Sequence, residues 1–109
     1  MITFDELRNA NIERKKEKVF PSHNWSLAQW ACAMAGECGE ACNIIKKMFR
    51  GDFKCLDEEI KANLDLADEL ADLVIYVDLT AEKAGIDLGE AIKNKFNKVS
   101  EKRGAKVKL

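Results

Sequence analysis

The sequence predicts an all-α protein with a four-helix bundle-like fold. Three observations predict this fold class. Apolar residues recur at helical spacing, with no strand-like alternation. The chain repeatedly shows a pattern that starts helices, in which Ser, Thr or Asp is followed three positions later by Glu or Gln. The single proline and the few glycines fall mostly at the expected helix ends. A chain of 109 residues supports one core but not two, so we expect a single domain over 1–109.

The first 24 residues predict a charged helix and a loop. Thr3 with Glu6 has the pattern of a capping box, in which each side chain bonds the other residue's backbone N–H. This pattern opens a helix that we expect to run to about Val19. Residues 20–25 then form a loop.

Two long helices follow. Ser26 with Gln29 repeats the capping pattern and opens a helix to about Arg50, where Gly51 stops it. After a short connector, a third helix is expected over about 57–83.

A fourth helix completes the domain. Gly85 ends the third helix, and Asp87 with Glu90 caps the fourth, which ends near Arg103. The tail 105–109 is expected to fray.

Charge and hydropathy exclude several classes of protein. With 18 basic and 19 acidic residues, the chain has no overall attraction to nucleic acid polymers or anionic membranes. No apolar run approaches the roughly 20 residues that span a bilayer. The first residues lack the pattern of a signal peptide. We therefore expect a cytoplasmic protein with neither a membrane nor a nucleic acid polymer as partner.

The cysteines do not predict a zinc site or a disulfide framework. There is no CxxC, and His23, the only histidine, lies away from Cys32, Cys38, Cys42 and Cys55. We interpret all four as reduced thiols, mostly in the core.

Two pairs of acids stand within otherwise apolar helical segments: Glu37 with Glu40, and Glu69 with Asp72. Acids three residues apart share one side of a helix, so each pair offers two carboxylates pointing the same way. Two such pairs on antiparallel helices would form a cage for a hard cation.

The two pairs have different settings. Glu37 shares its helix face with apolar residues at helical spacing, namely Trp30, Ala33, Ala41 and Ile44. A carboxylate among such neighbours needs a cation, a hydrogen bond or a proton. Glu69 and Asp72 instead border an apolar stripe beside Asp65 and Asp68, so spacing alone leaves open which of these acids bind metal, or whether they form a solvated acidic face.

The donor set indicates the ion. The acid pairs offer only oxygen as a ligand atom, and no ExxH pattern exists, which favours Mg²⁺, with Mn²⁺ as a substitute, over zinc or iron. Four carboxylates around one or two such ions leave positions open for water and for polyphosphate oxygens.

Three segments of the chain carry a family resemblance. They are WACAMAGECGE at 30–40 followed by Lys46-Lys47, DELADLVIY at 68–76, and an ending with GIDL at 85–88, Ala91, KFN at 95–97 and Arg103-Gly104. From about Trp25 onward the chain resembles the MazG-like all-α nucleotide pyrophosphohydrolases. A GExGE segment followed along the chain by an ELADxxIY segment is a specific signature of this family when both occur in this order.

The resemblance implies an enzyme that uses magnesium to cleave (d)NTP to (d)NMP and pyrophosphate by water attack at phosphorus. It implies metal ligands at Glu37, Glu40, Glu69 and Asp72, with Glu37 or Glu40 orienting the water or taking its proton. The expected substrates are non-canonical or selected deoxynucleotides, as in nucleotide pool sanitation.

Candidate substrate contacts lie outside the acid pairs. For the phosphates, the resemblance favours a lysine of the fourth helix together with nearby polar groups, and the basic end of the second helix is a further candidate: Lys95, Asn97, Arg103 and Lys47. For the base, aromatic residues can stack and the loop can read base edges. These candidates are Trp30, Trp25, Tyr76 and His23.

Two further expectations concern assembly and alternatives. Apolar runs at 44–49 and 74–77 would leave surface open in a monomer, so we expect a homodimer or homotetramer, as the resemblance also implies. Two alternatives stay open: a helical interaction module whose acids form salt bridges between subunits, and a magnesium-dependent nucleotide sensor without turnover.

Overall fold

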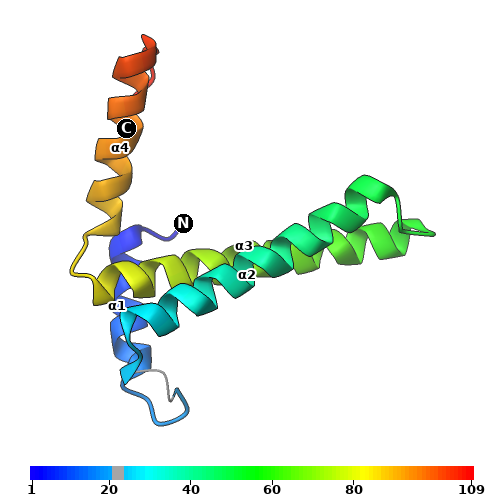
Figure 1. Cartoon of the computed structure of the whole chain (residues 1–109), viewed down its shortest axis with the longest axis horizontal. Helices are drawn as coiled ribbons and strands as arrows, with labels where there is room; N and C mark the ends of the chain where they lie inside the picture. Colours follow the sequence, from blue (N-terminus) through cyan, green and yellow to red (C-terminus); the bar gives the residue numbers. More distant parts are fainter. Residues whose placement is uncertain (21–23) are drawn as a thin grey trace.

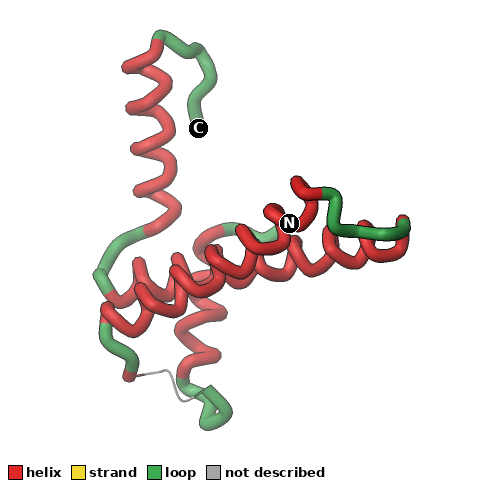
Figure 2. The backbone as a smooth tube through the Cα atoms, turned by 45° about the vertical axis from the view of Figure 1, so that its right-hand side comes forward, coloured by secondary structure: helices red, strands yellow, loops and turns green. Residues whose placement is uncertain are grey.

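The computed structural model describes residues 1–20 and 24–109, and within them the chain forms four helices and no strand. They are α1 (Phe4–Lys15), α2 (Leu27–Arg50), α3 (Leu56–Lys83) and α4 (Leu88–Arg103). Figure 1 shows α2 and α3 as a long antiparallel pair, with α1 crossing its base and α4 standing away from it. The turned view in Figure 2 shows the same separation of α4. The predicted all-α fold is confirmed.

The helix-start signals operate as predicted. Thr3 and Ser26 form capping boxes with Glu6 and Gln29, and the Asp87 carboxylate accepts a 2.9 Å hydrogen bond from a backbone N–H. The helix C-termini follow the glycines: Gly51 and Gly104 adopt φ of 69°, a left-handed conformation that a Cβ would strain. α3 begins at Leu56, one residue before the predicted start, without a side-chain cap.

The prediction that the first helix reaches Val19 is wrong, since α1 ends at Lys15. Beyond that point the backbone tightens into turns, and the N–H of Lys16 bonds a carbonyl three residues earlier at 3.1 Å. The Arg14 guanidinium lies 5.1 Å from the centre of the Phe20 ring. To bring Phe20 back over Arg14, the chain must leave the helix. A longer helix would also gain little from packing, because the lysines of this segment form no apolar face.

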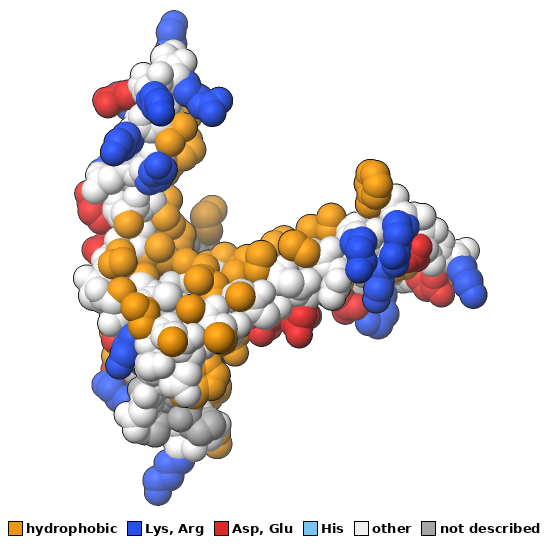
Figure 3. Space-filling model, viewed as in Figure 1, with side chains coloured by type: hydrophobic (Ala, Val, Ile, Leu, Met, Phe, Trp, Pro, Cys, Tyr) orange, Lys and Arg blue, Asp and Glu red, His pale blue; other side chains and the backbone are white. Residues whose placement is uncertain are grey.

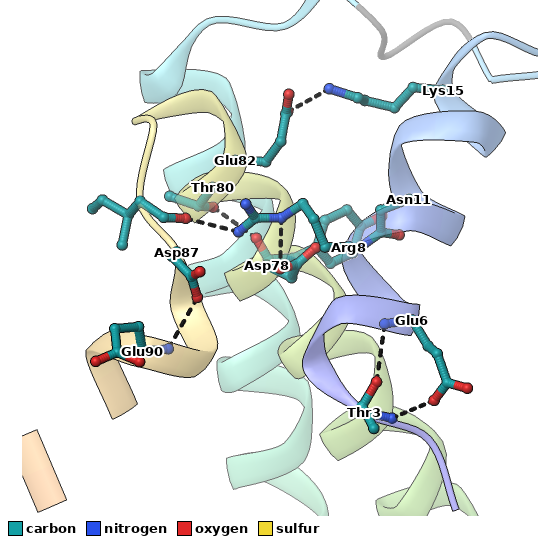
Figure 4. Close-up of polar contacts among 12 residues, drawn as sticks. Thr3, Glu6, Arg8, Asn11, Lys15, Asp78, Thr80, Glu82, Asp87 and Glu90 are labelled. Carbon is teal, nitrogen blue, oxygen red and sulfur yellow. Dashed lines mark hydrogen bonds and ion pairs between the residues drawn. The ribbon is translucent and has the colours of Figure 1, made fainter. Parts of the chain in front are cut away.

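A buried polar group holds α1 against α3. Asp78 of α3 is fully buried, and its two carboxylate oxygens accept hydrogen bonds from Arg8 Nε at 3.0 Å and Asn11 Nδ2 at 2.9 Å (Figure 4). Arg8 also donates to the Ile86 carbonyl at 2.9 Å, which ties in the loop before α4. Removing one partner from such a buried pair typically costs about 3–5 kcal/mol. This network therefore fixes α1 and the base of α4.

The chain is far more open than its length requires. Its radius of gyration is 17.0 Å, against about 13 Å for a compact domain of this length. Its accessible surface is 8226 Å², against about 6,100 Å² for a monomer of this mass. Many large apolar side chains are exposed along the far half of α2 and α3, among them Ile45, Phe49, Leu56, Ile60 and Leu64. Figure 3 shows apolar side chains along the inner side of the angle between this pair and α4.

One smaller expectation is corrected. All four cysteines are free and exposed, so the prediction that they lie mostly in the core is wrong. The tail 105–109 turns back along α4: the Asn97 amide donates to the Leu109 carbonyl at 3.1 Å and accepts from its N–H at 2.8 Å. That this tail frays stays a prediction. Across the described ranges, no helix is long and apolar enough to cross a membrane.

Candidate metal centre and adjoining pocket

Three carboxylates meet where α2 faces α3. One oxygen each from Glu37, Glu40 and Glu69 lie within 4.8 Å of one another. The first two come from successive turns of α2, and the third is brought to them by the antiparallel packing of α3. Glu37 and Glu69 are half-buried, whereas Glu40 is exposed. We call these three residues the acid centre.

Glu69 is the residue of the acid centre whose surroundings could best accommodate a cation. Its Oε2 is buried and has no hydrogen-bond partner among the residues that the structure describes. The neighbouring carboxyl groups of Glu40 and then of Glu37, followed by burial, raise the pKa of Glu69 to about 7. The raised pKa reflects the repulsion between like charges held this close, which a proton on Glu69 would relieve. A divalent cation fits the same oxygens, because hard cations prefer carboxylate ligands.

The structure brings together three of the four predicted metal ligands. The fourth, Asp72, is exposed one turn further along α3 and lies outside the acid centre. Its rival Asp65 accepts a 2.7 Å hydrogen bond from Lys61 and is neutralised locally. Asp68 is exposed and is also outside the three-carboxylate group. A metal-binding role for Asp72 stays a prediction.

No other helix of the described chain packs against Gly36 and Gly39, the glycines beside the acid centre. A Cβ built on Gly36 or Gly39 would meet nothing within 4 Å. Of the apolar neighbours predicted for Glu37, Trp30 and Ala41 are 2% and 3% exposed. The apolar stripe of α2 is therefore buried at Trp30 and Ala41, whereas the surface at Gly36, Gly39 and Glu40 is open.

A cavity of ≈ 210 Å³ adjoins the acid centre between α1, α2 and α3. We call it the aromatic pocket; its lining is Asn11, Arg14, Lys15, Phe20, Trp30, Asp72, Ile75, Tyr76 and Leu79. The ring centres of Trp30 and Tyr76 lie 6.0 Å apart, and those of Trp25 and Trp30 4.8 Å apart. Two of the predicted base-contacting residues, Trp30 and Tyr76, therefore line this pocket, and Trp25 contacts Trp30 without lining it.

Tyr76 links the pocket to the acid centre. Burial, followed by the negative charges of Glu37 and Asp72, raises the pKa of the Tyr76 hydroxyl, and the positive charge of Arg14 opposes them. Tyr76 lines the pocket together with Asp72, which lies one helical turn from Glu69 on α3. The carboxylates and the pocket are thus neighbouring parts of one site.

The predicted phosphate contacts lie away from the acid centre of their own chain. Lys95 and Arg103 line an exposed groove on α4, and among the described residues α4 contacts α1 and α3 but not α2. The side chain of Asn97 is engaged by the tail. Lys47 is exposed and lies about 10 Å along α2 from Glu40. His23 lies outside the described residues.

Sequence reasoning missed the contribution of α1. Asn11, Arg14 and Lys15 line the aromatic pocket, and none was a candidate. The only signal was that Asn11 and Arg14 stand three residues apart and so share a side of a helix. Because α1 is charged on all sides, no apolar stripe indicated which side faces inward.

Comparison with known proteins agrees with this geometry. Residues 26–106 match the family model of the MazG nucleotide pyrophosphohydrolase domain. Neither the curated proteins nor the solved structures gave a match. The matched segment contains α2, α3 and α4 with the whole acid centre, and leaves α1 outside. The predicted resemblance is confirmed, and the chain belongs to the MazG nucleotide pyrophosphohydrolase domain family.

Proposed function

We propose that this protein is a magnesium-dependent nucleoside triphosphate pyrophosphohydrolase that cleaves (d)NTP to (d)NMP and pyrophosphate. The observation that carries this proposal is the acid centre, with the unpartnered Glu69 oxygen, directly beside an aromatic pocket. Membership of the MazG family supports nucleotide pyrophosphohydrolysis as the reaction class. Mn²⁺ is the expected substitute, because it accepts the same oxygen ligands.

The division of labour follows from the positions of the carboxylates. Glu37, Glu40 and Glu69 would hold Mg²⁺, with Asp72 as a fourth ligand. When bound, the ion would neutralise the triphosphate and stabilise charge that develops on its oxygens. Glu40 or Glu37 orients a water and takes its proton. The water oxygen forms a bond to the α-phosphorus, the bond from that phosphorus to the bridging oxygen breaks, and pyrophosphate leaves with the electron pair.

We assign the missing phosphate contacts to another copy of the chain. Residues 88–109 carry seven Lys or Arg and two Asp or Glu, a net charge of +5, which leaves −6 on residues 1–87. Charge complementarity therefore favours docking of α4 against the acidic part of a neighbour. The exposed apolar surface of α2 and α3 supports the same homodimer or homotetramer. In this assembly Lys95 and Arg103 reach the phosphates of a neighbouring copy.

The biological role proposed is removal of non-canonical or selected deoxynucleotides from the cytoplasmic pool. The test is incubation with canonical and damaged (d)NTPs plus Mg²⁺, with pyrophosphate measured as the product. Pyrophosphate from at least one of them is expected. Tight Mg²⁺-dependent nucleotide binding with no pyrophosphate from any (d)NTP would identify a sensor instead. Absence of both, in a protein shown to be folded, would identify a helical interaction module.

A further inference from the structure

We infer that Arg14 determines base specificity at the expected base subsite in the aromatic pocket, selecting bases that present two adjacent hydrogen-bond acceptors. This inference rests on the proposed function, because it assigns the base subsite of the same nucleotide site. It comes from residues of α1, which lie outside the segment matched to the family.

Arg14 is the cation of this pocket that is available to a ligand. Its neighbour Lys15 also lines the cavity, but the Lys15 ammonium is paired with Glu82 of α3. Within residues 1–20 and 24–109, Arg14 forms no ion pair with a carboxylate. The guanidinium contacts the face of Phe20 and the side chain of Asn11. A guanidinium has five N–H donors, so most of them stay free for a ligand.

The contacts of Arg14 fix the direction of its guanidinium. Asn11 is 2% exposed, and its Nδ2 donates to the buried Asp78, so its amide orientation is set by the network that anchors α1. The Asn11 oxygen is then turned towards Arg14 and accepts from its Nη2 at 3.4 Å. The same guanidinium lies over the aromatic ring of Phe20, 5.1 Å from the ring centre. Arg14 is therefore held at the pocket before any ligand arrives.

The size and chemistry of the pocket suit a base. At ≈ 210 Å³ it is below the roughly 300–1,000 Å³ of sites that enclose drug-sized ligands, so it holds a base and not a whole nucleotide. Trp30 and Tyr76 supply an apolar aromatic wall. The triphosphate then extends past Asp72, which lines the pocket and lies one helical turn from Glu69, to the acid centre.

An arginine fork discriminates between bases by their acceptors. Its parallel N–H groups match two neighbouring acceptors, such as O6 and N7 of guanine or O2 and N3 of cytosine. Adenine and thymine have no two acceptors side by side. A good bidentate contact discriminates by about 10- to 100-fold. The pocket should therefore prefer guanine or cytosine nucleotides.

The test measures binding of dCMP, dGMP, dAMP and dTMP in EDTA by quenching of tryptophan fluorescence. Monophosphates in EDTA report the base subsite without turnover. We expect dCMP or dGMP to bind at least 10-fold more tightly than dAMP and dTMP. Arg14→Ala and Arg14→Lys should both lose this preference, because lysine keeps the charge but not the fork. Lys16→Ala is the matched control, since Lys16 is an exposed cation of the same chain segment and pairs with Glu13.

Two outcomes overturn the inference: equal affinity of the wild type for all four nucleotides, or a preference that survives Arg14→Ala. Circular dichroism of each variant excludes loss of fold as the cause. Failure here is distinguishable from failure of the proposed function. A wild type that releases pyrophosphate but shows no Arg14-dependent preference would contradict only the base subsite. One that shows the preference but releases no pyrophosphate would contradict only the reaction.

Discussion

The acid centre on α2 and α3 and the basic helix α4 differ in both charge and packing. The acid centre is assembled within one chain, because two antiparallel helices bring three carboxylates within 4.8 Å. The cations of α4 reach no such partner: Lys95, Lys98, Lys102 and Arg103 line an exposed groove on a helix that stands apart (Figure 3). The comparison teaches that one copy brings the carboxylates of the acid centre together but leaves the α4 cations apart from them. The proposed phosphate contacts therefore depend on the proposed assembly.

The largest effect is expected from the acid centre. Glu40→Gln keeps the size of the side chain but removes a carboxylate that would hold metal, so pyrophosphate release should fall by about 10²–10³-fold or more. Asp65→Asn is the matched control, because Asp65 is an α3 acid already paired with Lys61. Steady-state assays of pyrophosphate release measure both variants. Equal losses in the two would mean that the acid centre has no special role.

The second effect tests whether α4 acts on a neighbouring copy. Lys95→Ala should lower activity by about 10–100-fold, since it removes one phosphate contact. Mixing it with Glu40→Gln, after dissociation and reassociation, should restore activity, because some mixed sites then contain an intact acid centre and an intact α4. Size-exclusion chromatography with light scattering confirms that mixed oligomers form. If mixed oligomers form but activity stays at the level of the variants, α4 serves its own chain.

A third effect concerns metal and stability. Mg²⁺ at about 100 times its dissociation constant should stabilise the folded protein by about 2.7 kcal/mol, which corresponds to several degrees in Tm. Thermal unfolding with and without Mg²⁺ measures this shift. Glu69→Gln should abolish most of it, whereas Glu101→Gln on α4 should leave it intact. A full Mg²⁺ shift in the Glu69→Gln protein would place the ion elsewhere.

The smallest effect is the pH dependence of the metal-free protein. The folded pKa of Glu69 is raised to about 7 from 4.5, so the folded state binds more protons than the unfolded state between these values. Stability should therefore fall as pH rises from about 4.5 to 7. The groups facing Glu69 are Glu37 and Glu40 of α2, with Asp72 one turn away on α3. Urea unfolding in EDTA should show a flatter dependence in Glu69→Gln; an unchanged slope would assign the effect to other groups.

How much of this could be predicted from sequence depends on how local each feature is. Capping residues such as Thr3 and Ser26, and glycines such as Gly51, act within one turn, and they placed the helix ends well. Glu37 and Glu40 follow from spacing and from apolar neighbours on the same face. The end of α1 was missed because Arg14 and Phe20 contact each other across a turn that no helical period describes.

Features that depend on tertiary packing could not be predicted. Spacing pairs Glu69 with Asp72, but packing brings only Glu69 to Glu37 and Glu40, since the third acid position depends on the register between α2 and α3. The position of Arg14 at the pocket depends on buried Asp78, which is 67 residues from its partner Asn11. Helical periodicity places the cysteines on apolar faces, but it does not tell whether such a face is covered by the same chain or left exposed, as it is here.

The most direct test of the central claim is hydrolysis in ¹⁸O-labelled water with Mg²⁺, followed by mass spectrometry of both products. Water attack at the α-phosphorus predicts one ¹⁸O atom in the nucleoside monophosphate and none in the pyrophosphate. Glu40→Gln, assayed in parallel, should give neither product above background. Label in the pyrophosphate, or release of inorganic phosphate in its place, would contradict the account.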